Sequence, residues 1–205
     1  MGEQTAQTCA IAGNDSCRYS ILLHSGKELK PSCQMAQLVF EFVSDDLAAV
    51  VRAIKRVIDP GLCRCAVAQK FLDYEQCDNF DSAISDLQAG HAVSVVLRPE
   101  TKAIRYALVN EPYFNGSKCP GWFGTIEYTE LDYAPVWDHL LNEDGLRVVC
   151  LGFEEGVELD DMQQLSPEEF PWRSERLVVA AVRNRAGEWH TQRGSGYGSQ
   201  NLPPA

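Results

Sequence analysis

The sequence contains no long hydrophobic run and few basic residues. No stretch approaches the roughly 18 consecutive apolar residues of a membrane-spanning helix. Residues 1–17 also lack the basic start and apolar core of a secretion signal. With 18 Lys and Arg against 29 Asp and Glu in 205 residues, the net charge is −11. Because nucleic acids and anionic membranes bind clustered Lys and Arg, neither is expected as a partner. From the missing secretion signal and membrane-spanning run we expect a cytoplasmic protein.

The short motifs of common enzyme classes are also missing. There is no Walker loop, no G-x-G-x-x-G, no H-E-x-x-H and no G-x-S-x-G, so the sequence predicts no cofactor and no catalytic residue. One alternative stays open. Cys33, His91 and Asn110 follow the chain order of thiol, base and orienting amide in papain-like enzymes. They would make the protein a cysteine- and histidine-dependent enzyme whose site is assembled from distant residues.

Eight cysteines are present, but the chain has neither the small size nor the export signal of a disulfide scaffold, so we expect reduced thiols. Cys63 and Cys65 are two residues apart in a strand-like run, which places both thiols on one face. With Cys77 or His91 they would offer zinc ligands, although the paired Cys-x₂₋₄-Cys knuckles of zinc sites are absent. Small buried residues are the favoured interpretation, and no metal is predicted.

The best-defined element is an amphipathic helix over Ser44–Ile58. Ser44 is expected to cap its N-terminus, and Asp59-Pro60-Gly61 is expected to end it. The opposite, charged face carries Arg52, Lys55 and Arg56, interpreted as a solvated surface rather than an anion site. Its apolar side chains recur at helical spacing on one face: Leu47, Val50, Val51, Ile54, Val57 and Ile58.

The remaining chain alternates strand-like runs with two shorter helices. Strands are predicted at 18–24, 36–43, 62–72, 91–97, 103–110, 126–129, 146–152, 176–183 and 188–192, and helices at 78–89 and 135–141. This order indicates an α+β fold, a largely antiparallel sheet with two or three helices packed on one face. We expect a flexible arm at 1–16, a single domain at 17–193 with a possible minor break at 111–125, and a disordered tail at 194–205.

Negative charge is concentrated late in the chain. Residues 127–169 hold thirteen acids and one base, Arg147, a net charge of −12 that leaves the remainder close to neutral. Such crowding costs stability, and a cationic partner would relieve it. The alternatives are an acidic loop kept for solubility, or a calcium site without EF-hand spacing. The acids are densest at Glu154, Glu155, Glu158, Asp160 and Asp161.

A second candidate binding feature adjoins this segment. Trp122 and Phe123 lie between Gly121 and Gly124 in a predicted loop, and exposed aromatic side chains often anchor protein interfaces. The alternative is that both rings cover the core. Together with the five acids they predict a non-catalytic module that binds a basic protein, in the manner of inhibitors and bacterial immunity proteins. A structural subunit of a larger complex is a further alternative, and the oligomeric state stays open.

Overall fold

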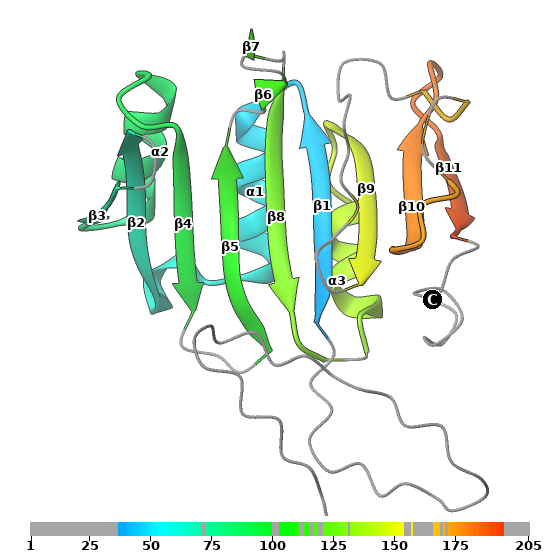
Figure 1. The fold of residues 1–205 in the computed structure, drawn as a ribbon, viewed down its shortest axis with the longest axis horizontal. Coiled ribbons are helices and arrows are strands. Elements are labelled where there is room, and N and C mark those ends of the chain that lie inside the picture. The colour runs from blue at the N-terminus through cyan, green and yellow to red at the C-terminus, as the bar shows by residue number, and fades with distance from the viewer. Residues whose placement is uncertain are drawn as a thin grey trace, which may run out of the picture. The chain divides into compact units, whose positions relative to one another are not determined.

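A computed structural model describes residues 37–70, 73–99, 103–110, 113–114, 117–118, 121–130, 132–153, 157, 166–168, 170 and 172–194 (Figure 1). All of these lie in one unit, Met35–Ala205. The predicted arm at 1–16, the predicted strand at 18–24 and residues 195–205 of the predicted tail lie outside the described residues.

Nine strands form one antiparallel sheet in the order β11-β10-β9-β1-β8-β5-β4-β2-β3 (Figure 1). They are β1 Leu38–Ser44, β2 Cys63–Lys70, β3 Asp73–Cys77, β4 Ser94–Pro99, β5 Ile104–Asn110, β8 Trp122–Tyr128, β9 Leu146–Phe153, β10 Leu177–Arg183 and β11 Trp189–Arg193. A separate small ribbon pairs β6 Tyr113–Phe114 with β7 Ser117–Lys118. The predicted α+β class and its largely antiparallel sheet are confirmed.

Three α-helices and one 3₁₀ turn complete the described elements: α1 Leu47–Val57, η1 Pro60–Leu62, α2 Phe80–Gln88 and α3 Ala134–Leu141. α1 packs on the centre of the sheet, against β8, β1 and β5, and α2 packs on β4, β2 and β3. α3 contacts α1 and β9. Among the described residues no helix is long and apolar enough to cross a membrane.

The predicted cap of α1 is wrong by two residues. Asp46 is the cap, and its side chain accepts a hydrogen bond from the Ala48 N–H at 2.9 Å. Ser44 instead ends β1, where its backbone is already committed to the ladders with β8 and β9. The Ser44 hydroxyl donates to the Gly145 carbonyl at 2.7 Å, so it joins β1 to the turn before β9.

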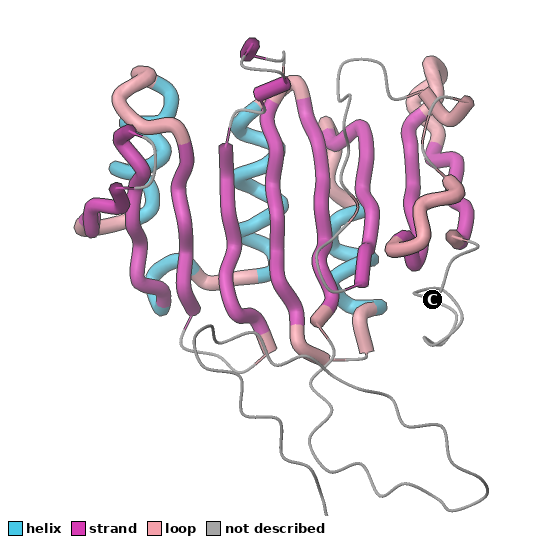
Figure 2. Tube along the Cα trace, viewed as in Figure 1, coloured by secondary structure: helices cyan, strands magenta, loops and turns pink. Residues whose placement is uncertain are grey.

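Strand alternation divides the core into two clusters. On one face of β1, Leu38, Phe40 and Phe42 join the buried side chains of all three helices. On the other face Val43 belongs to a second, smaller cluster that also contains Val148, Cys150, Val157, Phe170, Leu177, Ala180 and Val182. Figure 2 shows the helices in cyan behind the strands. β1 is therefore buried on both faces, unlike an ordinary strand with one solvated side.

Candidate functional site

One residue of the acid-dense stretch, Val157, is hydrogen-bonded to β1 in the middle of the sheet. Val157 lies between Glu155 and Glu158 in sequence and is only 1% exposed. Its backbone N–H donates to Glu41 Oε2 at 2.6 Å, and its side chain packs in the second cluster. The five predicted acids, Glu154, Glu155, Glu158, Asp160 and Asp161, lie outside the described residues. What the structure adds is the position at which this stretch meets β1.

Glu41 is a buried acid in the middle of the sheet. Because side chains alternate along a strand, it points away from the face that carries Phe40 and Phe42. It lies opposite Thr125 of β8 and Cys150 of β9 and is 8% exposed. A buried carboxylate needs hydrogen-bond donors, and the Val157 N–H is one of them. The hydrogen bond therefore satisfies the buried Glu41 carboxylate and fixes Val157, which follows β9, against β1.

The thiol beside Glu41 is unsuited to nucleophilic chemistry. Cys150 is fully buried, and its Sγ lies 3.8 Å from Glu41 Oε2. Burial, and then the charge of the Glu41 carboxylate, raise the pKa of Cys150 well above its usual value. The thiolate is the reactive form of cysteine, so Cys150 stays an unreactive thiol at neutral pH.

Removing the Glu41 carboxylate should loosen the attachment of Val157. In Glu41→Leu the Val157 N–H loses its acceptor, and a lost hydrogen bond to a charged group corresponds to about 1.5 kcal/mol, roughly tenfold in an opening equilibrium. We expect amide exchange at Val157 to accelerate about tenfold. Hydrogen-exchange mass spectrometry measures this, with the β4 and β5 amides as the internal control. Unchanged exchange at Val157 would contradict the assigned role of Glu41.

The two predicted aromatic anchors do not form a pair on a loop. Trp122 and Phe123 begin strand β8, opposite Ser44 and Val43 of β1. Successive strand side chains face opposite sides, so Trp122 packs against the first cluster and Phe123 against the second. Both are half-buried. The prediction that a single loop presents both rings is wrong, because the sheet, not the glycines, sets the backbone here.

Two acids of the −12 segment are neutralised inside the protein. Glu127, on β8, is buried and lies 3.1 Å from Arg105 Nη1. Glu143 is 1% exposed and lies 2.8 Å from Arg52 Nε and 3.1 Å from Arg56 Nε. These two carboxylates are structural. Five other described acids of the segment are exposed: Glu130, Asp132, Asp138, Asp144 and Glu168.

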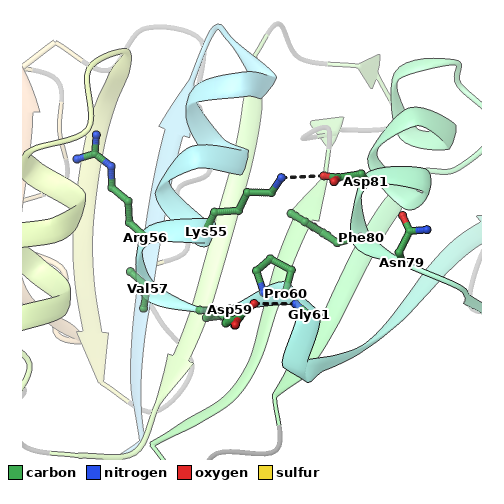
Figure 3. Close-up of a pocket in the computed structure, with 10 residues that line it drawn as sticks. Lys55, Arg56, Val57, Asp59, Pro60, Gly61, Asn79, Phe80 and Asp81 are labelled. Atoms are coloured by element: carbon green, nitrogen blue, oxygen red, sulfur yellow. Dashed lines mark hydrogen bonds and ion pairs between the residues drawn. The ribbon is translucent and has the colours of Figure 1, made fainter.

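A groove that sequence reasoning did not find lies between α1 and α2 (Figure 3). Its volume is about 590 Å³, and it is lined by residues 55–61 and 79–81. In Figure 3 the Lys55 side chain points toward Asp81, and the two form an ion pair at 2.7 Å. Since Arg56 pairs with Glu143, both bases of the groove already have acidic partners. The groove therefore shows no preference for an anion. The two segments that line it, 55–61 and 79–81, share no sequence motif and are brought together only by the fold.

The predicted cysteine- and histidine-dependent site lies only partly within the described residues. His91 follows α2, is 74% exposed, and has Nδ1 3.8 Å from Asp86 Oδ1. Cys33 lies outside the described residues. Cys63 and Cys65 do lie on one face of β2, as predicted, near Cys77 of β3. Within the described ranges no group of three or more His, Cys, Asp and Glu is arranged to hold a metal.

Comparison with known proteins identifies no relative of this chain, since no family, curated protein or solved structure matches it.

Proposed function

We propose that the protein is a non-catalytic binding module that engages a basic protein through the acidic surface after β9. The observation that supports this is the hydrogen bond from the Val157 N–H to Glu41, which holds one residue of the acid-dense stretch against the sheet. A stretch held at a defined place on a rigid scaffold presents its charges in a defined position. In this proposal the three helices cover one face only, and Val157 anchors the stretch to the other face.

Electrostatics favour a cationic partner. Glu154, Glu155, Glu158, Asp160 and Asp161 fall within eight consecutive residues without a single base. Like charges at this density repel one another, and a basic partner replaces that repulsion with attraction and accelerates association. The paired acids of the segment take no part in the proposal, because their charge is already matched inside the fold.

Phe123 extends the proposed surface. It is half-buried and packs against the cluster that contains Val157, so an aromatic ring lies on the same face of the sheet as this residue of the stretch. Aromatic residues beside charged ones are typical of interface anchors. Trp122, on the opposite face, supports β8 from the other side. The proposed mode of action is that of an inhibitor or immunity-type protein, which masks the cationic cleft of its partner.

A charge-reversal experiment tests this proposal. The immobilised chain retains a basic protein from an extract of its native host, and that protein is purified and titrated back at about 0.05 and about 0.5 M salt. We expect saturable binding that weakens with salt. Reversal of Glu154, Glu155, Asp160 and Asp161 to Lys should weaken binding at least about tenfold at the lower salt concentration, because each reversal replaces attraction with repulsion.

A matched variant separates a local surface from total charge. Reversal of Glu75, Asp78, Asp138 and Glu188, four exposed acids on β3, the bend before α2, α3 and the turn before β11, changes the net charge by the same amount. This control should bind like the unaltered chain. Equal weakening in both variants, or full binding by the first variant, would show that the acidic stretch is not the interface. Thermal unfolding of each variant checks that it is folded.

A further inference from the structure

Two cysteines face each other at one edge of the sheet. Cys65 on β2 lies directly opposite Cys77 on β3, and their sulfur atoms are 3.2 Å apart. Directly opposed residues of an antiparallel pair have Cα atoms about 4.5–5.5 Å apart, inside the range of about 4.4–6.8 Å that a disulfide spans. The thiols are therefore placed to form a bond with a small movement of their side chains.

We infer that Cys65 and Cys77 form a redox-modification site, in which a hydroperoxide converts the two thiols to a cross-strand disulfide. Cys77 is half-buried and Cys65 is buried, so the oxidant reaches Cys77 first. The Cys77 thiolate attacks the terminal oxygen of the hydroperoxide. A sulfur–oxygen bond forms, the oxygen–oxygen bond breaks, and an alcohol leaves with the thiol proton.

The second step closes the disulfide. The Cys65 sulfur attacks the sulfenic sulfur of Cys77, the sulfur–sulfur bond forms, and the hydroxyl group leaves as water with the proton of Cys65. Two thiols have then lost two electrons, and the hydroperoxide has been reduced to an alcohol and water. Burial, and then the contact with Cys77, raise the pKa of Cys65 to about 12. Cys65 is therefore the resolving thiol rather than the first nucleophile.

Neither of the other two described cysteines competes for Cys77. The Cys63 sulfur lies 3.2 Å from the Asp59 carbonyl oxygen, at the start of β2, and burial followed by the Asp59 charge raises the pKa of Cys63. Cys150 is fully buried in the second cluster, beside Glu41. Register alone therefore selects the pair Cys65 and Cys77.

The position of the pair gives the bond a structural effect. β3 is the edge strand, held in the described sheet by β2, and it leads through Asp78 and Asn79 into α2. Asn79 caps α2 and lines the groove between α1 and α2. A covalent link between β2 and β3 therefore restrains the edge strand and the entry to α2 together.

Peptide mapping tests the inference on the full chain. Cys9, Cys17, Cys33 and Cys119 are first replaced by Ser, so that the four described thiols remain. The folded protein is treated with a small excess of hydrogen peroxide, alkylated and cut with trypsin, which places Cys63 in peptide 57–64, Cys65 in 65–70 and Cys77 in 71–102. We expect peptides 65–70 and 71–102 to be joined, with a mass about 2 Da below their sum and full release on reduction.

Variants and a second measurement make the result decisive. Cys65→Ser and Cys77→Ser should each abolish the joined peptide, and Cys63→Ser, the matched control, should leave its yield unchanged. Oxidation should raise the melting temperature by about 5 °C, a shift that Cys65→Ser removes. The inference is overturned if peptide 57–64 carries the link, if Cys77 is oxidised further while Cys65 is alkylated, or if both thiols stay reduced while the unfolded chain reacts.

Discussion

Replacing both Arg52 and Arg56 with Met should lower the free energy of unfolding by about 3 kcal/mol. The two guanidinium groups lie 2.8 and 3.1 Å from the carboxylate of Glu143, which is 1% exposed. Without them a buried charge is left with no cationic partner, and this costs more than the pair itself contributes. Met keeps the aliphatic bulk of each arginine, so the loss reports on charge rather than on packing. Urea-induced unfolding measures the change.

Two further variants separate this explanation from a general effect of altering α1. Lys55 lies on the same helix and pairs with Asp81, but that pair is exposed at both ends, so Lys55→Met should cost under about 1 kcal/mol. Adding Glu143→Leu to the double Met variant removes the unpaired charge and should recover most of the loss. A double Met variant as stable as the parent, or a triple variant no more stable than the double, would rule out an electrostatic clamp.

The helix that carries these arginines was predictable, but their partner was not. Local spacing of apolar residues predicted α1, and its observed bounds, Leu47–Val57, fall within the predicted Ser44–Ile58. The sequence predicts a solvated face for Arg52 and Arg56 because their acidic partner is not close to them in the chain. Glu143 lies 91 residues after Arg52 and comes into contact only when α3 packs on α1. Sequence periodicity identifies the buried face of a helix, but not the contacts of its polar edge.

Hairpins with clear alternation were predicted well. β4 with β5 and β10 with β11 match the expected pairs, because apolar alternation and a short polar turn are both local signals. β3 was missed. Its sequence, Asp73–Cys77, is polar and too short to show alternation, and it is a strand because the edge of β2 offers it a partner. Edge strands of this kind are defined by the tertiary structure rather than by propensity.

The candidate site was only partly readable from the sequence. The charge count located the acidic segment, since composition needs no structure. It could not separate structural acids from exposed ones: Glu127 and Glu143 are buried against arginines, and Asp138 and Asp144 are exposed. Nor could it identify Glu41, an acid in an apolar run, as the residue that holds Val157. A single acid within an apolar, strand-forming run is the sequence signal that suggests such a role, because an isolated acid there is rarely buried without partners.

The sequence predicts a loop at the start of β8 because of Gly121 and Gly124. Glycine and proline are common in turns, and Gly121 and Gly124 bracket Trp122 and Phe123. Inside a strand, however, glycine marks a place where another group approaches the backbone closely. Gly124 pairs with Phe42 of β1, and a Cβ at this position would overlap three carbons of the Phe42 ring. Gly124 therefore leaves space for the Phe42 ring and does not form a turn.

Gly124→Ala should therefore destabilise the protein by about 3 kcal/mol, at the upper end of what overpacking a core costs. Phe42 is fully buried in the first cluster, so its ring has little space to move away. Urea-induced unfolding measures the loss. Gly61→Ala provides the matched control, because its Cβ would meet only the exposed side chain of Asp59 and should cost under about 1 kcal/mol.

A compensating change tests the cause. Phe42→Leu alone removes buried apolar volume and should be destabilising by itself. Combined with Gly124→Ala it makes room for the added methyl group, so the double variant should lose clearly less than the sum of the two single losses. Simple additivity would show that the alanine acts elsewhere than on the Phe42 ring. A coupling of at least about 1 kcal/mol would place the clash between β1 and β8, at the centre of the sheet to which Glu41 also belongs.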